Sequence, residues 1–162
     1  MDDFLLQTKA GTMRDSFLTT LSSTWKMGKD AILTESNPIT FLGIEFTMRA
    51  NGDIHLSQRH FVEYLLDKYD MQGVSPNKCV TMGPLPTVPD VPDLKALRRL
   101  QAFAGEFNWL ATRTRSDLSY ITSVLASSCS QFVAWSEELA RKVLKYLAGH
   151  RDIGVTITVS YT

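Results

Sequence analysis

The residues with the clearest potential for chemistry are two adjacent carboxylates at the start of the chain, Asp2 and Asp3. Carboxylate oxygens are among the ligands that Mg²⁺ prefers in proteins. Neighbouring side chains of a regular strand point to opposite faces, so two adjacent aspartates serve one metal site only at a tight turn. We interpret the pair as two Mg²⁺ ligands at a hairpin turn, with a solvated chain terminus as the alternative.

The elements next to this pair are predicted to be a strand at 4–6 and a helix from Thr12 to about Met27. The apolar residues of the helix recur at every fourth position, which places them on one face. They are Met13, Phe17, Leu21 and Trp25. We expect this face to be buried in a core.

The strongest β signal is the run from Ile39 to Met48, which is rich in β-branched and aromatic residues. Asn51 and Gly52 suit the central positions of a type I′ turn, where both residues need φ > 0. The chain from Asp53 to Leu56 then returns with apolar residues on one face. The pattern predicts a β-hairpin.

The rest of the chain is predicted to be mainly helical. Ser57 is expected to cap a helix, and five of the six prolines then mark 71–92 as a linker. Apolar periodicity predicts further helices after Asp93, after Ser116 or Asp117, and from Phe132 to Ala148. A strand follows at 153–159. The expected class is α+β, and most helical aromatic residues are expected in the core: Phe17, Trp25, Phe107, Trp135 and Tyr146.

The charge distribution is asymmetric although the 162 residues carry no net formal charge. Residues 1–92 carry 8 Lys/Arg against 11 Asp/Glu, and residues 93–162 carry 9 against 6. The positive second half allows a local surface that faces phosphates. No apolar run reaches the ~20 residues of a membrane span, the N-terminus lacks a signal-peptide pattern, and Cys79 and Cys129 form no close pair. We expect an intracellular protein, cytoplasmic or nuclear, without membrane contact or a small-molecule cofactor.

Several motifs, in one order over nearly the whole chain, resemble the reverse transcriptase of copia-type retrotransposons. In the first half they are Asp2-Asp3 with 4–6, the segment 25–28, the segment 39–46 and the segment 52–58. In the second half Leu100 to Leu110 resembles the family's G-x-x-x-Y-L helix, Thr114 to Tyr120 its T-R-P-D-(I/L)-x-Y motif, and Arg141 to Gly149 its R-V-L-R-Y-L-K-G helix.

The resemblance implies roles and boundaries. Asp2 and Asp3 would be catalytic aspartates of the family's Y-x-D-D turn, binding Mg²⁺ for two-metal nucleotidyl transfer. Phe41-Leu42-Gly43 would belong to a primer-grip-like hairpin. The implied regions are a palm remnant at 1–56, a helical thumb at 57–152 and the first strand of a ribonuclease H domain at 153–162. The implied partners are an RNA or DNA template–primer and the missing fingers and palm segments.

Two basic groups are candidate nucleic-acid contacts, each with a structural alternative. Arg113 and Arg115 lie between helices and either contact phosphates or form a salt bridge to Asp117 or Glu106. A second group shares one helix face and is either a contact surface or simply solvated: Arg141, Lys142 and Lys145.

The chain departs from the family pattern at Ser116, which replaces a proline, and in lacking the Tyr of the aspartate motif, the fingers and the strand with the other metal-binding aspartate. The sequence therefore predicts a fragment that is inactive alone. The alternative is a non-catalytic helical module that binds nucleic acid or protein, or an inert relic of a transposable element.

Overall fold

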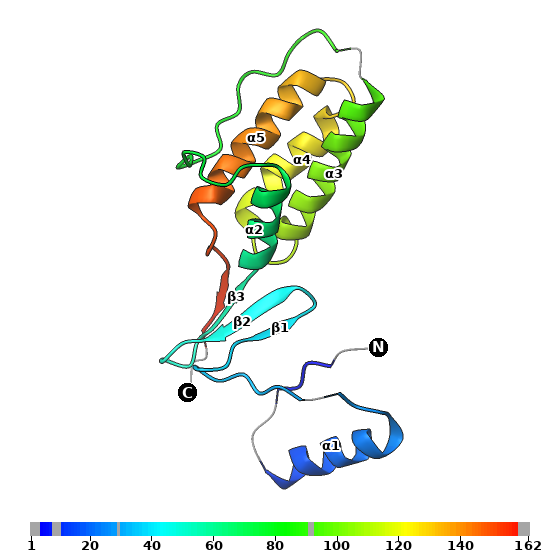
Figure 1. Cartoon of the computed structure of the whole chain (residues 1–162), viewed down its shortest axis with the longest axis vertical. Coiled ribbons are helices and arrows are strands. Elements are labelled where there is room, and N and C mark those ends of the chain that lie inside the picture. The colour runs from blue at the N-terminus through cyan, green and yellow to red at the C-terminus, as the bar shows by residue number, and fades with distance from the viewer. Residues whose placement is uncertain (1–3, 8–10, 29, 91–92, 159–162) are drawn as a thin grey trace.

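The computed structural model describes residues 4–7, 11–28, 30–90 and 93–158. These residues form an antiparallel four-stranded sheet and a bundle of helices next to it (Figure 1). Helix α1 (Thr12–Thr24) lies on the other side of the sheet, away from the bundle. The predicted α+β class is confirmed.

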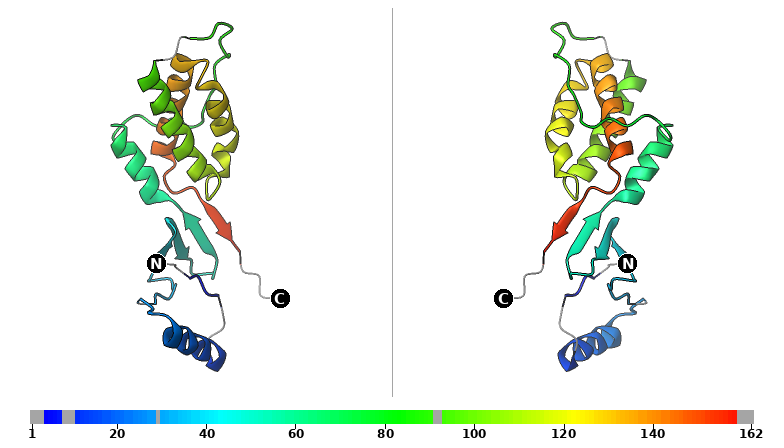
Figure 2. Two further views of the ribbon diagram at one scale, coloured as in Figure 1. Left: turned by 90° about the vertical axis from the view of Figure 1, so that its right-hand side faces the viewer. Right: turned by 90° about the vertical axis from the view of Figure 1, so that its left-hand side faces the viewer.

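The strands of the sheet lie in sequence order: β1 (Ile39–Phe41), β2 (Ile44–Met48), β3 (Ile54–Ser57) and β4 (Val155–Ile157). The predicted hairpin is confirmed, but the run predicted as one strand forms both β1 and β2. Strand β4 comes from the end of the described chain and pairs antiparallel with β3 (Figure 2). The strand predicted at 4–6 is wrong, because residues 4–7 have no regular structure.

The two turns differ from the predicted chemistry. Between β2 and β3, the amide of Gly52 donates to the carbonyl of Arg49 at 2.8 Å, and Gly52 has φ 85°. Asn51 does not have a positive φ, so this is a turn followed by a left-handed glycine rather than a type I′ turn. The turn whose two central residues both have φ > 0 joins β1 to β2, at Leu42 (φ 49°) and Gly43 (φ 74°).

The sheet separates apolar from polar side chains completely. Cross-strand partners share a face, and residues two apart along a strand share it too. One face carries Ile39, Phe41, Ile44, Phe46, Met48, Ile54, Leu56, Val155 and Ile157, and the other carries Thr40, Glu45, Thr47, His55, Ser57 and Thr156. The described part of the chain leaves all nine apolar residues at least partly exposed.

The bundle holds the hydrophobic core. Its helices are α2 (Arg59–Lys68), α3 (Leu94–Ala111), the 3₁₀ turn Ser116–Leu118, α4 (Ser119–Ser128) and α5 (Val133–Gly149). The largest fully buried apolar residues are Val62, Leu65, Leu66, Leu100, Phe107, Leu110, Leu118, Leu125, Val143 and Leu147. Helix α2 buries Val62, Leu65 and Leu66, and Gln58, rather than the predicted Ser57, occupies its N-cap position.

The aromatic residues predicted to be in the core divide into two groups. Phe107 is fully buried, and Trp135 and Tyr146 pack against the core while partly exposed. The prediction is wrong for Phe17 and Trp25, whose exposed fractions are 48% and 59%. Helix α1 buries none of its residues against the described chain. A periodic apolar stripe marks which face of a helix can be buried, but burial needs a partner surface.

The proline-rich linker runs along α5 instead of standing free. The amide of Asn77 donates to the carbonyl of Lys145 at 3.2 Å, and Gly83 lies beside the indole of Trp135. At the far end, the carboxylate of Asp90 accepts the amide of Ala134 at 2.9 Å. Because Phe132 provides no side-chain cap, Asp90 caps the N-terminus of α5 from a distance.

Candidate nucleic-acid interface

The predicted metal ligands Asp2 and Asp3 lie outside the residues that the structure describes. Their assignment as catalytic aspartates therefore stays a prediction. Across residues 4–7, 11–28, 30–90 and 93–158, no three His, Cys, Asp or Glu side chains come together in a way that could hold a metal ion.

The predicted primer-grip residues form the tip of the β1–β2 hairpin. Phe41 ends β1 and pairs with Ile44, while Leu42 and Gly43 make the turn between them. The left-handed conformation costs a residue with a Cβ about 1–2 kcal/mol. Leu42 adopts it with 60% of its surface exposed. An apolar side chain is thus held at the tip of a hairpin although it gains little burial there.

The hairpin tip lies against the C-terminal end of α3. A Cβ atom on Gly43 would lie 3.8 Å from Cζ2 of Trp109. One turn further along, the guanidinium of Arg113 lies over the indole ring of Trp109, 4.8 Å from its centre. Arg113 is exposed and has no ion-pair partner in the described part of the chain. A cation on an aromatic ring therefore stands beside an exposed apolar turn.

Arg115 does not belong to this surface, because its side chain is only 1% exposed. Its Nε and Nη2 donate to the two carboxylate oxygens of Asp117 at 3.0 and 2.8 Å. Its Nη1 donates to the carbonyl of His150 at 2.9 Å. The salt bridge to Asp117, one of the two alternatives, is the arrangement observed, and Arg115 is removed from the candidate contacts.

The Asp117 carboxylate also accepts the hydroxyl of Tyr146 at 2.9 Å. Burial alone would raise the pKa of Asp117, but the hydrogen bonds and charge of Arg115, with the Tyr146 hydroxyl, hold that pKa below its ordinary value. Burial and the bond to Asp117 raise the pKa of Tyr146. The motif that resembles T-R-P-D-(I/L)-x-Y thus ties the loop between α3 and α4 to the end of α5.

The second basic group lies along α5. Lys142 forms an ion pair with Glu138 at 2.7 Å, and both residues line a hollow between α5 and the linker. Arg141 is exposed and Lys145 is partly buried. Figure 1 shows the linker beside α5, on the side opposite α3. The structure therefore does not bring this group together with the hairpin tip.

Sequence reasoning missed Trp109 as a component of the site. The available signal was its spacing of four residues from Arg113, which corresponds to one helical turn at the end of the predicted helix. The proximity of Gly43 to Trp109 had no sequence signal, because 66 positions separate them.

Two known proteins resemble this chain. The first, "Uncharacterized mitochondrial protein AtMg00810" of Arabidopsis thaliana, is 28% identical over 160 residues, which cover 92% of this chain and 59% of that protein. The second, "Putative transposon Ty5-1 protein YCL074W" of Saccharomyces cerevisiae, is 27% identical over 114 residues, which cover 70% of this chain and 37% of that protein.

The chain thus spans less than two thirds of the length of either relative. No protein-family model matches the chain. No solved structure matches it either. Among the described helices, none combines the length and apolar character of a membrane span.

Proposed function

We propose that this chain is a transposon-derived fragment: the C-terminal palm and thumb portion of a copia-type reverse transcriptase. It binds a nucleic-acid duplex and does not polymerise alone. Two observations support this proposal. Several motifs follow one another along the chain in the order of that family, and the chain is similar to a protein named "Putative transposon Ty5-1 protein YCL074W".

One observation carries the binding function: the hairpin tip lies beside Trp109 of α3, and the exposed cation of Arg113, just past the end of α3, lies over the ring of that residue. Leu42 provides an exposed apolar contact, and Arg113, on the face of Trp109, provides a positive charge for phosphate. Contacts of this kind position a duplex without reading its sequence. The net positive charge of residues 93–162 favours the same partner.

Magnesium would bind, in the parent enzyme, to Asp2 and Asp3 together with a carboxylate from elsewhere. When bound, two such ions activate the attacking oxygen and stabilise the leaving group. This chain supplies two adjacent carboxylates, and among its described residues no three His, Cys, Asp or Glu side chains form a group that could hold a metal ion.

We expect purified protein to show no primer extension on a poly(rA)/oligo(dT) template with Mg²⁺ or Mn²⁺. Two adjacent carboxylates by themselves do not assemble the geometry for transfer, which also requires a third metal ligand and a bound nucleotide. The measurement is incorporation of labelled dTTP, with an intact reverse transcriptase as the positive control. Incorporation above a no-enzyme blank would contradict the proposal of an inactive fragment.

Arg113→Gln is expected to weaken binding to an RNA–DNA hybrid about five-fold at low salt, because one phosphate contact is lost. The slope of log affinity against log salt should fall by about one. The measurement is fluorescence anisotropy with a labelled hybrid of about 20 base pairs. Arg98→Gln is the matched control, since Arg98 is an exposed arginine at the other end of α3.

Equal losses for both variants would mean that the binding is not located at the hairpin tip. Absence of salt-dependent binding by the unsubstituted protein would favour the inert-relic alternative.

A further inference from the structure

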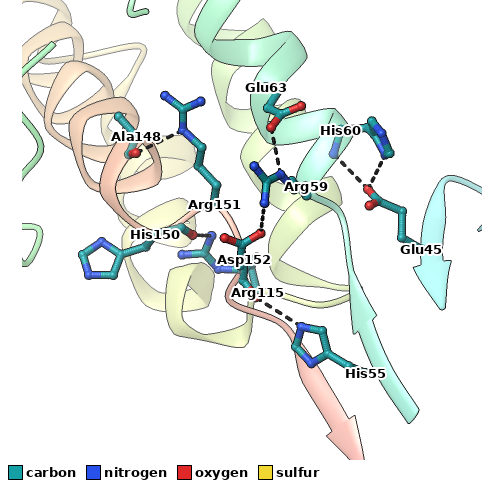
Figure 3. A network of polar contacts seen from close by, with 10 residues as sticks. All are labelled: Glu45, His55, Arg59, His60, Glu63, Arg115, Ala148, His150, Arg151 and Asp152. Atoms are coloured by element: carbon teal, nitrogen blue, oxygen red, sulfur yellow. Dashed lines mark hydrogen bonds and ion pairs between the residues drawn. The ribbon is translucent and has the colours of Figure 1, made fainter. Parts of the chain in front are cut away.

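The sheet and the bundle touch over little surface. In the described residues, the extensive contacts between elements lie within the sheet or within the bundle, and none joins a strand to a helix. The chain crosses between the two parts twice, from β3 into α2 and from α5 into β4 (Figure 3). The position of the hairpin tip relative to α3 therefore depends on the contacts between these two connecting segments.

An ion pair links the crossings directly. Nη1 of Arg59, the first residue of α2, lies 2.6 Å from Oδ1 of Asp152 in the segment between α5 and β4. Nε of the same arginine bonds to Glu63 at 2.9 Å, which orients the guanidinium. Figure 3 shows Arg59 between these two carboxylates.

A second contact links the hairpin itself to α2. Oε1 of Glu45 on β2 accepts the backbone amide of His60 at 2.8 Å and lies 2.9 Å from Nδ1 of its ring. Helix α2 has no side-chain cap of its own, so Glu45 satisfies one of its free amides. Because Glu45 pairs with Thr40 and Ser57 in the sheet, this bond holds β1, β2 and β3 together against the helix.

Hydrogen bonds hold the segment between α5 and β4 both to the sheet and to the bundle. Nε2 of His55 on β3 lies 3.2 Å from the carbonyl of Asp152, and its Nδ1 lies 3.2 Å from the hydroxyl of Thr156. On the bundle side, buried Arg115 donates to the carbonyl of His150. A continuous series of polar contacts thus runs from the bundle core to the sheet.

We propose that Glu45, Arg59, His60 and Asp152, here called the clasp, hold the hairpin turn at its spacing from Trp109 and Arg113. Arg59 and Asp152 are then positioning residues for duplex binding, an inference that rests on the proposed function. The pair contributes little to folding, because the side chains of Arg59 and Asp152 are 48% and 72% exposed. The pair instead limits rotation of the sheet relative to the bundle, because only two segments of the chain, β3–α2 and α5–β4, connect the two parts.

The test combines a distance measurement with a binding measurement. Spin labels at Thr47→Cys on β2 and Gln101→Cys on α3 occupy exposed positions, in a Cys79→Ser background that removes the exposed native thiol. Double electron–electron resonance without nucleic acid should give one narrow distance distribution. Asp152→Asn and Arg59→Gln should each broaden it and weaken hybrid binding about five-fold.

The double variant should lose little more than either single variant, because both substitutions break the same pair. Asp67→Asn is the control for charge, since Asp67 is an exposed carboxylate of α2 outside the clasp. The thermal unfolding midpoints of the clasp variants should match that of the control. A destabilised fold would lower these midpoints, whereas loss of positioning alone would not.

An unchanged distance distribution in Asp152→Asn and Arg59→Gln would overturn the clasp, whatever happens to binding. Broadening together with weaker binding supports the positioning role. If the unsubstituted protein does not bind the hybrid, the proposed function fails and the positioning role fails with it. The distances, measured without nucleic acid, would still decide whether the clasp holds the two parts together.

Discussion

Asp117→Ala is expected to lower the free energy of unfolding by about 3–5 kcal/mol, because it leaves the buried guanidinium of Arg115 without its counter-charge. Arg115 is 1% exposed and would keep only the carbonyl of His150 as a hydrogen-bond acceptor. Tyr146 would also lose its acceptor. Since whole domains unfold at a cost of about 5–15 kcal/mol, the loss is a large fraction of the total. Urea titration followed by circular dichroism measures it.

Glu138→Gln provides the matched control, because it removes a carboxylate from an exposed pair. The Glu138 side chain is 65% exposed and pairs with Lys142 one turn away. Such pairs contribute about 0–1 kcal/mol. Equal losses of unfolding free energy in the two variants would show that the Arg115–Asp117 pair does not stabilise the contact between the α3–α4 loop and α5.

The same pair gives stability a dependence on pH. The pKa of Asp117 is lowered in the folded protein. Its carboxylate therefore makes its full contribution to the free energy of unfolding above the pKa of an unfolded aspartate, about 3.9. That contribution is lost as pH falls through the lower folded value. The stability difference between the unsubstituted protein and Asp117→Ala should therefore narrow below about pH 4. Urea titrations at a series of pH values measure the narrowing.

Gly154→Ala is expected to detach β4 from the sheet and to lower the free energy of unfolding by about 2–3 kcal/mol. A Cβ atom at position 154 would overlap with the carbonyl oxygen of Leu56 on β3. Both are backbone-fixed positions, so no side-chain rotation relieves the clash. Hydrogen exchange by mass spectrometry should show faster exchange in peptides covering β3 and β4.

Gly105→Ala is the control for this substitution. Gly105 lies inside α3 with nothing near the position of an added Cβ. Alanine should stabilise the helix by about 0.5–1 kcal/mol there, because it loses less backbone entropy than glycine. Unchanged exchange in β3 and β4 of Gly154→Ala would show that the strand tolerates the methyl group.

Local patterns predicted the helices well where a partner surface exists in this chain. The helix predicted after Asp93 appears at Leu94–Ala111, and the one predicted from Phe132 appears at Val133–Gly149. The same periodicity failed for burial in α1, none of whose residues is buried against the described chain. Periodicity encodes an amphipathic face, whereas burial depends on what packs against it.

Turn chemistry explains the error at the hairpin. Asn51-Gly52 is a strong turn signal and did produce a turn, but of another type. Leu42 is not a turn-forming residue, so Ile39 to Met48 looked like one uninterrupted strand. The alternation of apolar and polar residues still placed every strand side chain on a consistent face.

By itself, the sequence determined the α+β class, the hairpin and the order of the motifs. These depend on residue types and short spacings, which act through local backbone preference. Only the tertiary structure decided that Arg115 is buried against Asp117 and that Trp109, with Arg113 over its ring, lies beside the hairpin tip. It also decided that Arg59 meets Asp152 across the two crossings. Arg59 meets a partner far away in the chain, and the buried guanidinium of Arg115 is held by the carbonyl of His150 as well as by its near neighbour Asp117. Such contacts follow from how whole elements pack, which no local pattern encodes.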